Sequence, residues 1–199
     1  MSIKIGLTGG LASGKTTVTK FLKKKNFLVH DSDLVVKKLY STPSPAFLTY
    51  LKKINFSKSI KNKKINKNII REEIFNNRKK KNKLEKFVHG EVKKDRDRFI
   101  KKNKKTKVLF FDIPLLFEAN LSQTCDYIIL LYAPKVIRIK RATSKKKIAK
   151  KLVLKILDNQ LGDNYKKRRS DFVINTSKSK TYCFKMILEV IDIIIKKNA

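Results

Sequence analysis

The chain has 199 residues, 41% of them hydrophobic, which is enough for one globular domain with a sizeable core. Its net charge of +34 would attract polyanions non-specifically. Lysines, however, run through the whole chain, and arginine occurs at only eight positions. We therefore expect that the lysine excess reflects drift in amino-acid composition and that the protein has no specific nucleic-acid site. The two cysteines, Cys125 and Cys183, form neither a metal motif nor a disulfide framework, which favours a reducing cytoplasmic setting.

The first residues already read as a strand, so we expect no signal peptide ahead of the fold. The longest purely apolar run, residues 127–133, is far shorter than the about 20 residues that a membrane-spanning helix needs. The sequence therefore predicts a protein without a membrane partner.

The chain opens with a strand, a glycine-rich loop and a helix, predicted over residues 3–8, 9–16 and 17–22. The loop satisfies the phosphate-loop pattern of Gly, four residues, Gly-Lys, then Ser or Thr. Its glycines allow backbone N–H groups to face a phosphate, and the helix directs its positive dipole end at the same anion. An ordinary glycine turn is the alternative, but the strand–loop–helix context favours a nucleotide site formed by Gly9, Gly10, Leu11, Ala12, Ser13, Gly14, Lys15, Thr16 and Thr17.

Two residues of this loop have specific expected roles. Lys15 would bridge the β- and γ-phosphates of a nucleotide, and the hydroxyl of Thr16 would ligate Mg²⁺. ATP and Mg²⁺ are therefore the expected cofactors.

A second strand is predicted over residues 26–30, followed by Asp31 and Asp33 and a helix over 34–40. Ligands of open α/β sheets bind at the carboxyl ends of strands, where these carboxylates lie. We expect one of the pair to cap the helix. Asp33 is the candidate that accepts the proton of a phosphoryl acceptor, and Asp31 would order the site or the water shell of the metal.

Residues 41–45 break the pattern with two prolines, and residues 46–103 are rich in helix formers, which predicts an all-helical excursion. A crossover between parallel strands needs only one helix, so the extra length suggests an inserted cap that holds a substrate. Arg71 and His89 stand out in it as candidate substrate contacts, although a lone histidine is more often an ordinary polar residue.

Three further strands are predicted over residues 107–112, 127–132 and 172–174. Asp112 ends the first of them, where an acidic residue either holds Mg²⁺ through water or caps the next turn; both readings stay open. A helix from residue 135 to about 142 carries Arg138 and Arg141 on one face. They could close over a triphosphate, and we expect at least one to be solvated.

The last helix, predicted over residues 180–197, is amphipathic, with an inward face of Phe184, Ile187, Leu188, Ile191, Ile194 and Ile195. Five apolar strands separated by helices predict an α/β fold: a three-layer structure with a five-stranded, mostly parallel sheet.

Taken together, the motifs resemble the dephospho-CoA kinase family of P-loop kinases. The resemblance rests on residues 5–10, 14–18, 31–33, 112–118 (Asp-Ile-Pro-Leu-Leu-Phe-Glu) and 170–175, in the order and spacing of the family. It implies transfer of the γ-phosphate of ATP to the ribose 3′-hydroxyl of dephospho-CoA. It also implies a core (residues 1–40, 106–134 and 170–199), a helical CoA-binding insertion (41–105) and a lid (135–169).

Carried over residue by residue, the resemblance makes Asp33 the base, Arg141 a lid arginine and Gln160 the glutamine that follows the lid. Residues 71–76 and 84–89 resemble two segments of the helical region, which makes Arg71 and His89 substrate contacts. The departures from the family pattern are Gly90, Lys145 in place of a second lid arginine, Gly162 and Ser170. Because lysine lacks the guanidinium fork, lid closure would be weaker.

Two alternatives remain at this stage: another small-molecule or nucleotide kinase with the same core, and a basic nucleic-acid-binding protein with a phosphate loop. No aromatic and basic signature of an RNA-binding sheet supports the second. We expect a monomer or weak homo-oligomer whose partner is its small-molecule substrate.

Overall fold

A computed structural model of the chain describes residues 2–146 and 148–198, without the side chains of residues 145 and 146. The expected substitution of a lid arginine by Lys145 therefore lies outside the described side chains. The chain divides into two compact units. One contains the residues up to His30 and those from Asn103 onward, and the other is Asp31–Lys102.

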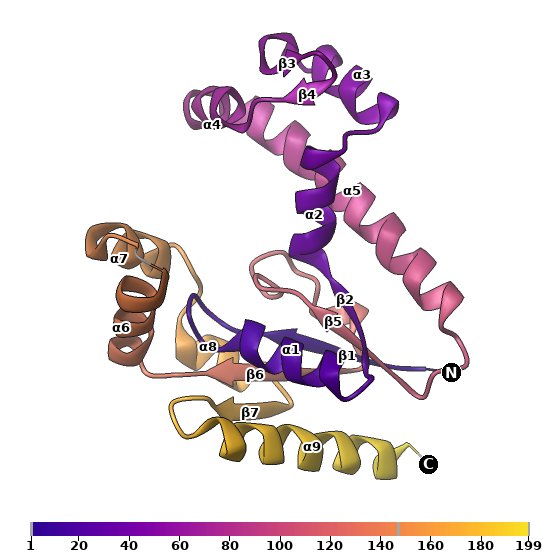
Figure 1. Cartoon of the computed structure of the whole chain (residues 1–199), viewed down its shortest axis with the longest axis vertical. Helices are drawn as coiled ribbons and strands as arrows, with labels where there is room; N and C mark the ends of the chain where they lie inside the picture. Colours follow the sequence, from indigo (N-terminus) through magenta and orange to yellow (C-terminus); the bar gives the residue numbers. More distant parts are fainter. Residues whose placement is uncertain (1, 147, 199) are drawn as a thin grey trace. The chain divides into compact units, whose positions relative to one another are not determined.

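The first unit is built on a sheet with the strand order β2-β5-β1-β6-β7 (Figure 1). The strands are β1 (Ile3–Thr8), β2 (Leu28–Asp31), β5 (Val108–Asp112), β6 (Tyr127–Tyr132) and β7 (Phe172–Asn175). The pairs β1–β5, β1–β6 and β6–β7 are parallel. This confirms the predicted α/β fold with a five-stranded parallel sheet.

Within its described residues this unit has the α-helices α1 (Lys15–Lys24), α6 (Lys135–Lys146), α7 (Lys150–Asp158), α8 (Asp163–Arg168) and α9 (Lys180–Lys197). A 3₁₀ turn, η2 (Ser122–Thr124), precedes β6. All five residues of β5 are buried, as expected for a strand covered on both faces. The core joins strand residues such as Ile5, Phe110 and Ile129 to Ile187 and Ile194 of α9.

Helices α1 and α9 lie side by side (Figure 1). The rings of Phe21 and Phe184 stack between them with their centroids 4.0 Å apart. The predicted bounds of α9 are confirmed. Its predicted inward face is wrong at Leu188, which is exposed, whereas Cys183 and Val190 are buried.

The helices that follow β6 form a small cluster of their own. Ala142, Val153 and Leu157 are buried together, and Leu11 and Ala12 of the phosphate loop pack against them. The loop therefore shares a hydrophobic contact with the segment predicted as a lid.

The second unit contains α2 (Ser32–Ser41), α3 (Pro45–Lys53), η1 (Ser57–Ser59), α4 (Lys67–Asn76) and α5 (Arg78–Lys102). Its own core includes Phe47, Leu51, Phe56, Ile70 and Leu84. The prediction that residues 46–103 are all helical is wrong, because β3 (Ile60–Lys61) and β4 (Lys64–Ile65) form an antiparallel hairpin.

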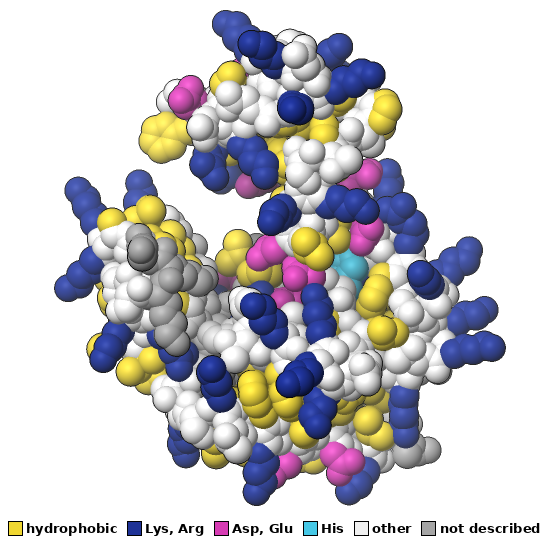
Figure 2. All heavy atoms as spheres, in the orientation of Figure 1, with side chains coloured by type: hydrophobic (Ala, Val, Ile, Leu, Met, Phe, Trp, Pro, Cys, Tyr) yellow, Lys and Arg dark blue, Asp and Glu magenta, His cyan; other side chains and the backbone are white. Residues whose placement is uncertain are grey.

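Lysine and arginine side chains are spread over the face of the molecule seen in Figure 2 rather than gathered in one patch. Among the described helices, none combines the length and apolar character that crossing a membrane requires.

Candidate active site

The phosphate loop leaves the carboxyl end of the central strand β1 and leads into α1. Gly14 precedes the first turn of α1 with a φ of 92°, in the left-handed region that a residue with a Cβ rarely adopts. The N–H of Ser13 donates to the carbonyl oxygen of Gly10 at 3.1 Å, which closes the turn of the loop. The expected strand–loop–helix arrangement is thus present, at the sheet edge where ligands of α/β folds bind.

Lys15 and Asp112 form an ion pair at this edge. The register pairs Leu7 of β1 with Asp112 of β5, which brings the end of β5 beside the loop. The second carboxylate oxygen of Asp112 accepts a hydrogen bond from the hydroxyl of Thr19 at 2.7 Å. The Asp112 side chain is 5% exposed, so Lys15 supplies the charge that balances it and Thr19 satisfies its second oxygen.

Thr16 and Thr17 lie in the first turn of α1 and are exposed. The described residues contain no group of three or more His, Cys, Asp or Glu side chains that could hold a metal ion. Oxygen donors for Mg²⁺ near the loop are the Thr16 hydroxyl and the Asp112 carboxylate, which suits an ion bound largely through phosphates and water.

Both arginines of α6 are engaged with other groups, so the expectation that one is solvated is wrong. Arg138 is buried; its Nε donates to the carbonyl oxygen of Ala133 at 2.9 Å, and its Nη2 donates to Asp163 Oδ2 at 2.6 Å. A Cβ on Gly10 would lie 2.5 Å from Arg138 Nη1, which explains the glycine there.

Arg141 is half-buried and bonds to Thr176, the residue after β7. Its Nη2 donates to the Thr176 carbonyl oxygen at 2.6 Å, and its Nη1 donates to Oγ1 at 3.3 Å. Burial raises the pKa of the nearby Cys183 thiol, although the charge of Arg141 acts in the opposite direction. The two bonds to Thr176 hold the Arg141 guanidinium beside the end of β7.

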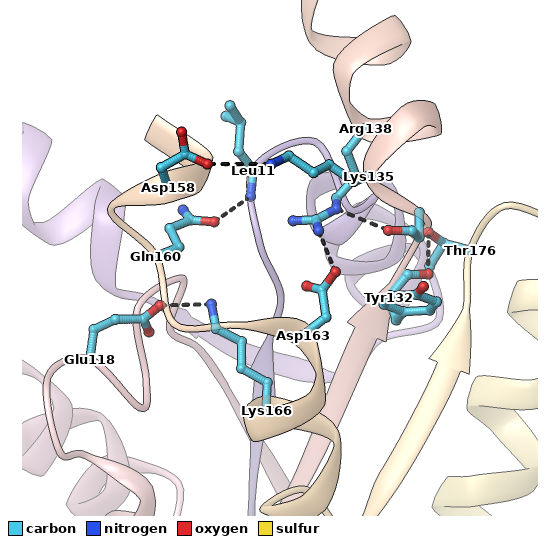
Figure 3. A network of polar contacts seen from close by, with 11 residues as sticks. Leu11, Glu118, Tyr132, Lys135, Arg138, Asp158, Gln160, Asp163, Lys166 and Thr176 are labelled. Carbon is cyan, nitrogen blue, oxygen red and sulfur yellow. Dashed lines mark hydrogen bonds and ion pairs between the residues drawn. The ribbon is translucent and has the colours of Figure 1, made fainter. Parts of the chain in front are cut away.

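The segment between α7 and α8 also contacts the loop, as Figure 3 shows. The side-chain oxygen of Gln160 accepts a hydrogen bond from Leu11 N at 3.1 Å. Close by, Lys166 forms an ion pair with Glu118 at 2.7 Å, and Glu118 also accepts a bond from Leu161 N. Glu118 ends the Pro-Leu-Leu-Phe-Glu stretch, so that motif anchors the chain around Gln160.

A groove of about 490 Å³ lies in the same region. Its lining combines apolar side chains with amide and carboxylate groups: Phe117, Glu118, Asn120, Gln160, Leu161 and Tyr165. The volume falls within the range of small-molecule pockets.

The remaining predicted residues belong to the second unit. The side chain of Asp31 accepts a hydrogen bond from Leu34 N at 3.0 Å and caps α2, so one of the two carboxylates is a helix cap as expected. Asp33 lies in the first turn of α2 and is exposed. Arg71 on α4 and His89 on α5 are also exposed.

Residue patterns did not indicate several members of the site, among them Thr19, Thr176, Asp163 and Lys166. Thr176 had a weak signal, because it follows the last predicted strand. The pairing of Lys166 with Glu118 had none, since the two are far apart in the sequence.

Comparison with known proteins places these features in a family context. The family model described as dephospho-CoA kinase matches residues 3–181. A dephospho-CoA kinase of Fusobacterium nucleatum subsp. nucleatum is 34% identical over 191 residues, covering 94% of this chain and 96% of that relative. One from Bartonella henselae is 32% identical, with 96% and 98% coverage.

Among solved structures, dephospho-CoA kinase from Campylobacter jejuni shares 26% identity and a TM-score of 0.73, over the whole of both chains. The structure of TT1252 from Thermus thermophilus has a TM-score of 0.82 at 23% identity, over 96% of each chain, and supports the fold alone.

Proposed function

The chain belongs to the dephospho-CoA kinase family, which acts at the final step of coenzyme A synthesis, and from this premise we propose the chemistry of its site. The protein transfers the γ-phosphate of ATP to the ribose 3′-hydroxyl of dephospho-CoA. The observation that carries this proposal is the phosphate loop, with Lys15 paired to the buried Asp112 at the carboxyl edge of the sheet.

The loop and Lys15 hold the phosphates of ATP. In the structure the Lys15 ammonium contacts Asp112, and we propose that it moves to the β- and γ-phosphates when the nucleotide enters. Asp112 keeps its bond to Thr19 during this exchange, so the carboxylate stays oriented. Lys15 thus has a partner both with and without nucleotide.

The oxygen donors near the loop fit a bound Mg²⁺. The Thr16 hydroxyl would hold the ion, and Asp112 would contact it through water. When bound, Mg²⁺ neutralises phosphate charge.

The roles toward the acceptor and the transferring group are proposed from the family resemblance. Asp33 accepts the proton of the 3′-hydroxyl, and Arg71 and His89 contact dephospho-CoA. Arg141 offsets charge on the transferring phosphoryl group. A guanidinium carries five N–H donors, so the two bonds to Thr176 use only part of its capacity.

The test is an ADP-release assay coupled to a chromogenic readout, with ATP and Mg²⁺ and either dephospho-CoA, a nucleoside monophosphate or no acceptor. We expect dephospho-CoA alone to stimulate ADP release. Lys15→Ala should abolish the stimulated rate. It also leaves the buried Asp112 carboxylate without its cation, so we expect a lower melting temperature, and circular dichroism at the assay temperature checks that the variant is folded. Equal stimulation by nucleoside monophosphates, or turnover retained without the lysine, would contradict the proposal.

A further inference from the structure

We propose that Thr176 is a positioning residue for nucleotide binding, a role that rests on the proposed kinase function. Its hydroxyl holds the carbonyl of Ser13 and so fixes the direction of the next amide of the phosphate loop. Thr176 follows β7 and is buried, 163 residues from Ser13 in sequence.

The hydrogen bonds of Thr176 identify Ser13 as the partner of its hydroxyl hydrogen. Oγ1 lies 2.5 Å from the Ser13 carbonyl oxygen and 3.1 Å from that of Tyr132. A hydroxyl has one hydrogen to donate, and the shorter contact takes it. The Tyr132 carbonyl is already served by Thr176 N at 2.7 Å, so the backbone of Thr176 is fixed independently of its side chain.

The geometry of a peptide bond converts this contact into a constraint on the loop. A trans peptide is planar, so the carbonyl of Ser13 and the N–H of Gly14 point in opposite directions. No described peptide bond is cis. Holding the carbonyl toward Thr176 therefore turns the Gly14 N–H away from Thr176, and in our proposal this amide faces the phosphate.

Packing supports the same contact. Gly14 has a φ of 92°, and a Cβ at that position would lie 3.3 Å from both Cβ and Oγ1 of Thr176. The side chain of Thr176 thus lies directly against Gly14, whose backbone would otherwise rotate freely because it has no Cβ.

The same threonine also binds Arg141, through its carbonyl oxygen and its hydroxyl. One residue therefore sets the position of a loop amide and of the arginine proposed to meet the transferring phosphate. Removing only the hydroxyl breaks the bond to Ser13 and leaves the stronger bond of Arg141, which goes to the backbone.

The test compares Thr176→Val with Thr176→Ser by calorimetric titration with ATP and with ADP. Valine has nearly the shape of threonine but cannot bond to Ser13, so we expect the dissociation constants to rise about tenfold or more, because a buried carbonyl is left unsatisfied. Serine keeps the hydroxyl and should stay within about twofold of the unaltered protein. In turnover, the valine variant should raise KM for ATP far more than KM for dephospho-CoA.

Thr143→Val is the matched control, because the Thr143 hydroxyl bonds only carbonyls of its own helix in the described contacts. If the valine variant at 176 does not fold, Thr176→Ala takes its place in the same titration. Unchanged nucleotide affinity in a folded variant without the hydroxyl would overturn the proposal, and so would a serine variant as weak as valine. The titration needs no acceptor, so its outcome is independent of whether dephospho-CoA is the substrate.

Discussion

Asp31 and Asp33 show how two identical side chains, one residue apart, can have different tasks. The carboxylate of Asp31 accepts the Leu34 N–H and so satisfies a donor at the start of α2. Asp33 is exposed in the first turn of the same helix. Capping of α2 accounts for the Asp31 carboxylate, and Asp33 remains the candidate base.

Replacing Asp33 tests that assignment. Asp33→Asn keeps the size of the side chain and removes its basicity, so kcat should fall by about 10²–10⁴-fold with little change in KM for ATP. Steady-state kinetics with dephospho-CoA measures both constants. Asp31→Asn is the control, since asparagine caps a helix as well as aspartate does, and its kcat should stay near normal. A kcat for the Asp33 variant within a few-fold of normal would remove Asp33 as the base.

At the scale of elements, the sequence predicted those with strong local signals. The last helix was predicted at its observed bounds because its apolar period is sustained. In the structure the hydroxyl of Ser179 caps this helix by accepting a hydrogen bond from the N–H of Tyr182. The hairpin β3–β4 was missed because its strands have two residues each. Its turn residues Asn62 and Lys63 both have positive φ, and lysine hides the usual Asn-Gly signal.

The residues of the site also fall into those that local sequence patterns predict and those that they do not. The loop could be predicted because its residues are contiguous and each follows from the chemistry of phosphate binding. Contacts such as Thr176 with Ser13, or Arg138 with Asp163, join residues far apart in the chain. Which residues meet there is decided by the order of the strands and by where α6 and α8 pack, and neither can be read from local patterns.

The link between α6 and α8 leads to a prediction about stability. Arg138 and Asp163 pair at 2.6 Å, with side chains 7% and 32% exposed. Removing one partner leaves a poorly solvated charge, whereas removing both does not. In a double-mutant cycle of Arg138→Met and Asp163→Ala, we expect a coupling free energy of about 1 kcal/mol or more, measured by urea unfolding.

An exposed pair provides the comparison for this cycle. Lys185 and Glu189 lie four residues apart on α9, with side chains 76% and 46% exposed. Solvent screens such a pair, so its coupling free energy should lie within about 0.5 kcal/mol of zero. Equal coupling free energies in the two cycles would show that the burial of Arg138 does not strengthen its interaction with Asp163.

For the whole molecule, the main electrostatic feature is its excess of positive charge, with 50 Lys and Arg residues and only 16 Asp and Glu residues. Some described acidic groups pair within one helix, as in Lys196 with Asp192, and others pair across the fold, as in Lys4 with Asp126. Most lysines therefore face other cations across solvent, and their mutual repulsion opposes the compact state.

Salt should relieve this repulsion and raise stability. Between about 0.1 M and about 1 M NaCl the Debye length falls from about 10 Å to about 3 Å, which screens repulsion between separated lysines more than it weakens ion pairs in contact. We expect the melting temperature to rise over this range, measured by differential scanning calorimetry without nucleotide, because ATP stabilises a folded kinase by binding. Chloride is the anion to use, since sulfate and phosphate would occupy the phosphate loop. A melting temperature that stays flat or falls with NaCl would mean that local ion pairs, and not the net charge of +34, control the electrostatic part of the stability.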